Sequence, residues 1–308
     1  IAGLNIGHGL AFANRDRHNV LGMCHPGTTF GFRAYICLFP DEKKGFFYAA
    51  NTDNETADYE KFNELFINKL GVVSPPIAEA TGKEVNLSKL EGIYLLSPNN
   101  MAEFEFIDML FSFLWLEQSN EHLLIKSLQA ADKRLIQIGD HLFRDVNRTQ
   151  ASHVFYWNSE SKLFLSDGLK TFKQASVITL LLYWISLIFG LIGLLYIFIV
   201  SLIRGIKRDK ASFARIKWGF INLLLFSLPI YLYVQQSFLQ FGDITAASIS
   251  LAFLSGILPL TLLFSLWTSL RANLQSKFTK LDIAALISAI QFSLVLLIWG
   301  QLPIIFWQ

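Results

Sequence analysis

Apolar residues are distributed unevenly along the chain, and its second part consists of long apolar runs. The segment from Ser176 to Ile203 contains no Asp, Glu, Lys, Arg or His. A bilayer core of about 30 Å is crossed by a helix of about 20 such residues. Further runs of sufficient length lie at about Trp218 to Val234, Ala246 to Leu270 and Ile283 to Phe306. The pattern therefore predicts four membrane-spanning helices within residues 176–308.

The first part of the chain has short apolar runs between turn residues. They lie at Asn19 to His25, Phe32 to Phe39 and Phe46 to Asn51. Short runs separated by Gly-rich or Pro-rich turns predict an antiparallel meander. From Asp58 to Leu70 the apolar spacing changes to that of a helix, with Thr56 as its expected N-cap and Gly71 as its end. Strands followed by a helix indicate the last part of an α+β domain, over residues 1–74.

A linker from Ser74 to Glu84, which begins Ser-Pro-Pro, separates this domain from a second β-rich domain at residues 86–174. Turn residues punctuate a series of short apolar runs there, which predicts a small all-β sandwich or barrel. The expected strands are Glu103 to Ile107, Phe113 to Glu117, Leu123 to Ser127, Leu135 to Ile138, His153 to Trp157 and Leu163 to Ser166.

Composition supports a lipid bilayer as a partner and excludes nucleic acid. Hydrophobic residues make up 53% of the chain and charged residues 16%, against about 25% charged residues in soluble domains. The formal net charge of +2 is too small for a nucleic-acid-binding protein. The histidines show no spacing that would place two of them on one helical face with an acid, so neither a metal site nor a cofactor is expected. The oligomeric state stays open.

Charges between the apolar runs predict how the helices are oriented. Basic residues are retained in short cytoplasmic loops. The first loop contains Arg204, Lys207, Arg208, Lys210, Arg215 and Lys217, and the third contains Arg271, Lys277 and Lys280. The second loop, from Gln235 to Thr245, has Asp243 and no Lys or Arg. Loops one and three are therefore expected in the cytoplasm. The N-terminal soluble portion and the C-terminus are expected outside it, in a multi-pass protein of the plasma or inner membrane.

The predicted helices have no acid or base at depth, and this favours an anchor over a transporter. Two cysteines, Cys24 and Cys37, permit at most one disulfide. Both lie in short apolar stretches, so we expect buried, unpaired thiols. The chain begins at Ile1 with no initiator Met and no leader. This start indicates a longer protein, with residues needed for chemistry expected upstream.

Several motifs in the first part of the chain occur in a familiar order. Residues 22–35 read GMCHPGTTFGFRAY, and residues 45–51 read GFFYAAN. This order resembles the end of the catalytic domain in beta-lactamase-related serine hydrolases, the family of class C beta-lactamases, penicillin-binding proteins and esterases. Residues 7–10, GHGL, are similar to the family's Gly-x-Gly-Leu, and residues 90–94, LEGIY, resemble the start of the small C-terminal barrel of many members. The resemblance covers residues 1–173.

The resemblance implies roles for four consecutive residues. His25-Pro26-Gly27 looks like the family's third motif, which is Lys-Thr-Gly or His-x-Gly. The residue after it would supply a backbone N–H to the oxyanion, which implies Thr28. His25 would face the substrate, and Pro26 and Gly27 would lie against it. A neutral imidazole suits an ester or a peptide that lacks a carboxylate. The structural alternative for His25 is a partly buried strand histidine.

The family's other motifs, Ser-x-x-Lys and Tyr-x-Asn, are missing from the part of the chain before His25. Matches at residues 156–158 and 159–162 adjoin each other in a polar segment in reversed order, which is typical of a hairpin turn. The sequence therefore predicts the C-terminal part of a membrane-anchored serine hydrolase that lacks its nucleophile and is inactive alone. The alternative is a non-catalytic membrane receptor or sensor with an extracytoplasmic β-rich ligand-binding domain.

Overall fold

The fold was analysed in a computed structural model of the chain. It describes residues 3–4, 7, 9–29, 31–52, 57–80, 85–99, 104–272 and 277–307. The chain divides into two compact units. The first comprises residues 1–100 and 107–177, and the second residues 101–106 and 178–308. His8, which belongs to the GHGL motif, lies outside the described residues.

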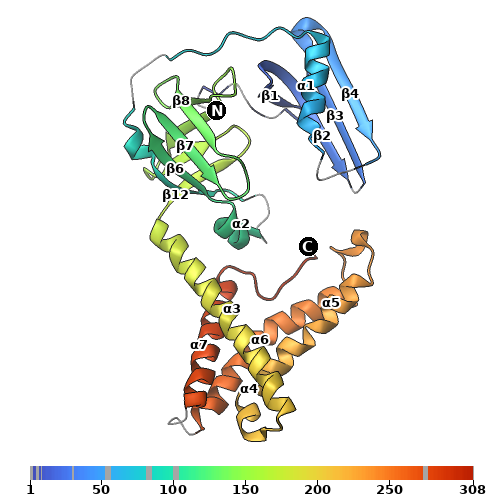
Figure 1. The fold of residues 1–308 in the computed structure, drawn as a ribbon, viewed down its shortest axis with the longest axis vertical. Coiled ribbons are helices and arrows are strands. Elements are labelled where there is room, and N and C mark those ends of the chain that lie inside the picture. Colours follow the sequence, from blue (N-terminus) through green and yellow to red (C-terminus); the bar gives the residue numbers. More distant parts are fainter. Residues whose placement is uncertain are drawn as a thin grey trace. The chain divides into compact units, whose positions relative to one another are not determined.

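The first unit begins with a four-stranded antiparallel sheet in the order β1-β2-β3-β4 (Figure 1). The strands are β1 (Ala13–Arg17), β2 (Val20–Thr29), β3 (Phe32–Phe39) and β4 (Lys44–Ala50). The three predicted strands are confirmed. Strand β1 was not predicted, because its sequence ANRDR is polar. Its hairpin to β2 turns through His18 and Asn19, both at positive φ, which matches the twist of the flanking strands.

Helix α1 (Tyr59–Leu70) covers one face of this sheet (Figure 1). Under it lies a core of Val20, Cys24, Tyr35, Cys37, Phe39 and Ile67. Aromatic rings extend this core, and Phe66 of α1 stacks on Phe46 with ring centroids 5.2 Å apart. The opposite face of the sheet is exposed and carries Leu21, Met23 and Phe47. The sheet therefore buries only one of its two faces within the described residues.

The ends of α1 correct one prediction and confirm another. Asp58, not Thr56, is the N-cap, and its carboxylate accepts hydrogen bonds from the backbone N–H groups of Glu60 and Lys61. A carboxylate is a good N-cap because it accepts both hydrogen bonds and its negative charge interacts favourably with the positive end of the helix dipole. Thr56 lies outside the described residues. Gly71 ends the helix at φ 58°, as predicted.

The prediction of unpaired cysteines is wrong, because Cys24 and Cys37 form a disulfide. The two residues are direct partners in the β2–β3 register, with Cα atoms 4.1 Å apart. Both are buried under α1. Apolar surroundings indicated burial but carried no information on which residues of the two strands face each other.

The second part of this unit is a closed antiparallel barrel, which decides between the predicted sandwich and barrel. Its strand order is β10-β11-β12-β5-β6-β7-β8-β9. The strands are β5 (Gly92–Leu96), β6 (Leu114–Ser119), β7 (His122–Ser127), β8 (Lys133–Gln137), β9 (Leu142–Asp145), β10 (His153–Trp157), β11 (Leu163–Ser166) and β12 (Thr171–Ala175). Tyr94, Phe143 and Phe155 are among the side chains that fill its interior.

One predicted strand of this region is wrong. Residues 103–107 contribute instead to helix α2 (Glu105–Phe111), and residue 103 lies outside the described part. The reason is the spacing of the buried side chains Phe106, Met109 and Leu110, which is that of a helix. Of the chance motif matches at residues 156–162, Tyr156 and Trp157 end β10, and the remaining residues form the turn to β11, where the backbone N–H of Asn158 donates to the carbonyl oxygen of Lys162.

The second unit contains four helical segments that are long and apolar enough to cross a membrane. They are α3 (Val177–Ile206), α4 (Lys210–Leu225) continued by α5 (Ser227–Val234), α6 (Ala246–Leu270) and α7 (Lys277–Ile298). These helices indicate a membrane protein. The second segment breaks at Phe226, three residues before Pro229. The fourth ends at Ile298 instead of Phe306, because Gly300 at φ 67° and Pro303 follow.

The helices extend further at one end than predicted, and this changes the environment of three charged residues. Arg204 and Arg215, which were assigned to a loop, lie within α3 and α4. Asp282 of α7 is fully buried and forms ion pairs with both. Arg204 donates from both terminal nitrogens at 2.9 and 3.0 Å, Arg215 donates from Nε at 2.8 Å, and the Tyr196 hydroxyl donates at 3.0 Å. A buried charge cluster therefore joins α3, α4 and α7.

Candidate functional site

Strand β2 carries all four residues that the resemblance singled out. Because side chains alternate along a strand, Pro26 and Thr28 point to the same side as Cys24, and His25 points to the opposite side. The structure therefore brings Pro26 and Thr28 to one cavity, whose lining they share. It leaves His25 on the other face of the sheet. Gly27 lies between Pro26 and Thr28 in the strand.

The edge of β2 beyond Cys24 is open. Strand β1 pairs with β2 only as far as Ala13 and Cys24, and no strand in the described part of the chain continues on that side. On its other side, β2 pairs with β3 as far as Thr29. Pro26 has no backbone N–H and cannot donate a hydrogen bond to β3. In a regular ladder a proline is therefore found at a position where the N–H of another residue would point away from the neighbouring strand. By the period of two, the N–H of Thr28 points to the same open edge.

His25 is exposed, so it is not a core residue of the sheet. Its Nδ1 contacts the carbonyl oxygen of Ala11, and its ring lies edge-on to Phe12 with centroids 6.4 Å apart. A carbonyl oxygen only accepts hydrogen bonds, so this contact assigns the proton to Nδ1. In the neutral ring, Nε2 is then the acceptor that remains for a second partner.

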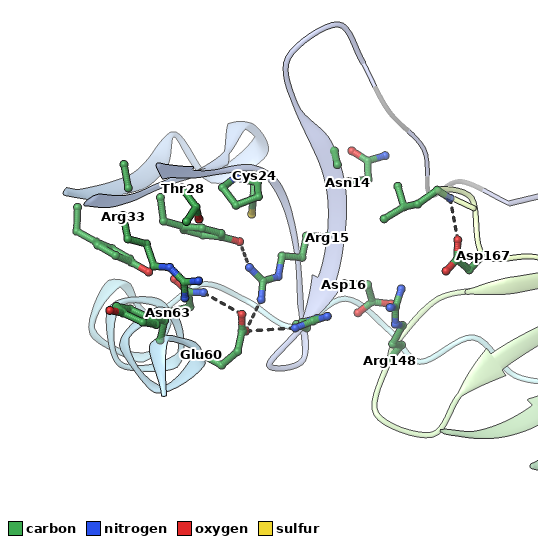
Figure 2. A pocket seen from close by; sticks show the side chains of 18 residues that line it. Asn14, Arg15, Asp16, Cys24, Thr28, Arg33, Glu60, Asn63, Arg148 and Asp167 are labelled. Carbon is green, nitrogen blue, oxygen red and sulfur yellow. Dashed lines mark hydrogen bonds and ion pairs between the residues drawn. The ribbon is translucent and has the colours of Figure 1, made fainter. Parts of the chain in front are cut away.

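A cavity of about 350 Å³ lies beside β1, β2 and the first turns of α1 (Figure 2). Its lining is rich in charged side chains, which come from the sheet, from α1 and from two barrel loops. They are Arg15, Asp16, Arg17, Arg33, Glu60, Arg148 and Asp167. Sequence reasoning identified none of them. Arg15, Asp16 and Arg17 were missed because β1 was not recognised as a strand, and the other four come from separate elements that only the fold brings together. The alternation of Arg15, Asp16 and Arg17 is the signal that would have indicated this strand.

Glu60 is the centre of an ion-pair network at this cavity. Arg15 donates to both the Glu60 carboxylate and the Tyr35 hydroxyl (Figure 2). Arg17 and His18 lie 3.5 and 3.3 Å from the same carboxylate. Partial burial raises the pKa of Glu60, but the hydrogen bond from Arg15 and the charges of Arg15 and Arg17 outweigh it and leave the pKa lowered. Glu60 is therefore ionised at neutral pH.

A second guanidinium of the cavity rests on an aromatic ring. Arg33 lies over Tyr59, with its central carbon 4.0 Å from the ring centroid. A planar guanidinium held in this way is suited to a carboxylate or phosphate, because it offers parallel N–H donors. The arginines outnumber the acids in the lining. The cavity therefore has the chemistry of an anion-binding site.

Asp16 points away from Arg15 and Arg17 and is fully buried. It accepts hydrogen bonds from the backbone N–H of Thr149 at 2.8 Å, from the Thr149 hydroxyl at 3.0 Å and from the N–H of Gln150 at 2.7 Å. A buried carboxylate with three donors is satisfied. We interpret Asp16 as a structural residue that holds β1 against the loop before β10.

His153 is the buried histidine of the barrel. Its Nδ1 lies 2.8 Å from the Ser152 hydroxyl, which accepts the backbone N–H of Asp145 and can therefore donate its own proton to the ring. Burial lowers the pKa of His153 well below its ordinary 6.5, and the charges of Lys133 and Arg148 lower it further. The ring is therefore neutral in the folded barrel.

The depressed pKa of His153 predicts a pH-dependent stability. Below about pH 6.5 the unfolded chain binds a proton that the folded chain does not, so stability is retained above this pH and falls below it. The slope is about 1.4 kcal/mol per pH unit. Hydrogen exchange of barrel amides between pH 5 and 7 should reveal this slope in the wild type, and His153→Asn should remove it. The exposed His141→Asn is the control, and an equal slope in all three proteins would contradict the assignment.

None of the family models matches this chain, and neither does any curated protein with which it was compared. The evidence on function is therefore the arrangement of the residues themselves.

Proposed function

We propose that this chain is the C-terminal portion of a membrane-anchored serine hydrolase related to beta-lactamases, acting on an ester, a peptide or a β-lactam outside the cytoplasm. The open edge of β2, with the backbone N–H of Thr28 directed to it, carries the proposal. Acyl transfer to a serine needs such a donor where the oxyanion develops. In the family that the sequence resembles, this donor follows the third motif, at the position of Thr28.

The exposed face of the sheet supports the same proposal. Leu21 and Met23 are each 40% exposed and Phe47 is 63% exposed, and His25 lies on their face. An exposed apolar patch on a sheet indicates a surface that another part of the protein or a partner covers. A catalytic domain that continues upstream would supply this layer, together with the Ser-x-x-Lys and Tyr-x-Asn motifs. The cleft would then lie along the open edge of β2.

Each residue has a defined part in this mechanism. The upstream serine attacks the substrate carbonyl after the neighbouring lysine accepts its proton. The N–H of Thr28 donates to the carbonyl oxygen as negative charge develops on it. His25 faces the substrate from the exposed side of the sheet with Nε2 as an acceptor. Pro26 and Gly27 keep the strand extended against the substrate.

The disulfide and the loop charges support the proposed location. Disulfides persist in oxidising compartments and are rare in the cytosol, and Cys24–Cys37 lies in the soluble portion. Basic residues gather where α3 meets α4 and where α6 meets α7, in the connections and the adjoining helix ends, and the positive-inside rule assigns these ends to the cytoplasm. We therefore propose a multi-pass protein of the plasma or inner membrane, with the soluble portion and the C-terminus outside. The helices serve as its anchor.

The proposal predicts that residues 1–308 alone hydrolyse neither a chromogenic ester nor a chromogenic cephalosporin. The upstream-extended protein should form an acyl-enzyme at its Ser-x-x-Lys serine, measured by mass spectrometry with a fluorophosphonate or a β-lactam. Hydrolysis by the chain alone would refute the proposal, as would a gene that encodes no Ser-x-x-Lys upstream.

In the extended protein, a variant that removes one backbone N–H tests the proposed oxyanion donor directly. Thr28→Pro removes the N–H and should lower kcat by about 10²–10³ fold, whereas Thr28→Ala keeps the N–H and should retain activity. Proline is tolerated at this position because the group points away from the ladder. His25→Ala should also reduce turnover with little change in melting temperature, and His141→Ala in the barrel is its matched control. Equal turnover of Thr28→Pro and Thr28→Ala would exclude the backbone N–H of Thr28 as the oxyanion donor.

The cavity beside α1 favours a second candidate, a receptor or sensor that binds an anion. The guanidinium groups of Arg15 and Arg33 in a space of about 350 Å³ are the observation behind it. Isothermal titration of the chain with small dicarboxylates distinguishes the two candidates. Binding that is lost in Arg33→Gln, in a protein with no serine that can be acylated, would favour the receptor.

A further inference from the structure

We infer that a groove between α4 and α6 binds the phosphate headgroup of an anionic phospholipid. The groove has a volume of about 470 Å³ and lies where the C-terminal end of α6 meets the first turns of α4. Its lining includes the cations Arg215, Lys217 and Arg271 and the aromatic side chains of Trp218 and Phe264. This inference depends on the second unit alone and not on the hydrolase proposal.

The charge around the groove is positive and incompletely balanced. Asp282 is shared by Arg204 and Arg215, so one carboxylate faces two guanidinium groups. Arg215 reaches it through Nε and also lines the groove, with 13% of its side chain exposed. Asp209, the other acid in this part of the second unit, caps α4 by accepting the N–H of Ser212. A bound phosphate would complete the charge balance.

Aromatic rings hold the cations of the groove. The Lys217 ammonium lies 4.9 Å from the centroid of Trp218, and the Arg271 guanidinium lies 3.8 Å from that of Trp267. Trp218 in turn packs edge-on against Phe264 at 5.7 Å. Tryptophan is enriched at the level of lipid headgroups. We therefore place the two cations at the depth of the lipid phosphates.

The apolar continuation of the groove favours a lipid over a soluble anion. Leu260, Phe264 and Thr268 lie on the same side of α6. The side chains of Leu260 and Phe264 are 66% and 45% exposed. One turn of helix separates each of these positions from the next. A phospholipid would contact the cations with its phosphate and the apolar side chains of α6 with its acyl chains. Inorganic phosphate would contact only the cations.

The test measures lipid retention by the full chain in native mass spectrometry, with phosphatidylglycerol and phosphatidylcholine as probes. The wild type should retain phosphatidylglycerol in preference. Lys217→Ala with Arg271→Ala should weaken this binding by roughly 30-fold, the loss expected from two cationic contacts. The control pair, Lys207→Ala with Lys210→Ala, removes the same charge from exposed residues outside the groove and should retain binding.

Three outcomes would overturn the inference. Equal retention of the two lipids would remove the role of the headgroup charge. An equal loss in both pairs of variants would indicate diffuse attraction to a basic surface. Displacement of the lipid by an equal concentration of inorganic phosphate would identify a soluble anion as the ligand. The conservative pair Lys217→Arg with Arg271→Lys should retain binding.

Discussion

Asp282→Asn is expected to destabilise the helical region by about 3–5 kcal/mol, the cost of breaking a buried ion pair by removing one partner. Asn keeps the size of the side chain and one acceptor oxygen. It leaves Arg204 and Arg215 without a counter-charge in a site where Asp282 is fully buried. The measurement is the unfolding midpoint of α3–α7 in mixed micelles of mild and denaturing detergent.

Asp243→Asn is the matched control, because Asp243 is an exposed aspartate of the loop before α6. It should leave the midpoint unchanged. Replacing the whole cluster by Arg204→Met, Arg215→Met and Asp282→Leu should recover most of the loss, because apolar side chains of similar volume need no counter-charge. If Asp282→Asn unfolds at the wild-type midpoint, the cluster does not hold the helices together.

This cluster marks a limit of prediction from sequence. Apolar runs identified the four helical segments of the described residues that are long and apolar enough to cross a membrane, since length and hydropathy are properties of one segment. The pairing of Asp282 with Arg204 and Arg215 depends on how three helices pack, which no single segment encodes. The two arginines were assigned to a loop because they lie at the ends of the apolar runs, and Asp282 was not identified at all. In the structure all three lie inside helices; Arg204 and Asp282 are buried, and 13% of the Arg215 side chain is exposed.

The sheet shows a similar division between local and non-local information. Strands β2, β3 and β4 followed from their apolar content, and the end of α1 followed from Gly71. The disulfide did not, because it depends on the register that sets Cys24 opposite Cys37. The barrel strands β5, β9 and β12 were missed because short strands in a closed barrel are defined by their neighbours.

The candidate site was partly predictable. The sequence predicted a strand that ends at His25, whereas β2 continues to Thr29 and so also contains Thr28; the opposite directions of the two side chains follow from the strand period. The open edge beside Thr28 did not, because it results from where β1 stops pairing. The Arg15–Glu60 pair joins β1 to α1 across a long stretch of sequence, and only the folded sheet brings these groups together.

Gly193→Ala is expected to destabilise the contact between α3 and α7 by about 1–3 kcal/mol, the usual cost of overpacking. A Cβ at this position would lie 2.5 Å from the carbonyl oxygen of Ala285 and 3.0 Å from the N of Ala289. Both atoms belong to the backbone of α7, so neither can move aside without moving the helix. Gly190 has the same role one turn earlier, where a Cβ would lie 2.2 Å from Cβ of Phe292.

The sign of this effect separates packing from helix propensity. Alanine favours a helix over glycine by about 1 kcal/mol, so a glycine without neighbours gains from the change. Gly205 is such a residue, because it lies in the same helix and, apart from its own stretch of that helix, no atom of the described residues lies within 4 Å of its added Cβ. Gly205→Ala should therefore raise the unfolding midpoint slightly or leave it unchanged, while Gly193→Ala lowers it. If both variants shift the midpoint in the same direction, the glycines of α3 do not act as contact points for α7.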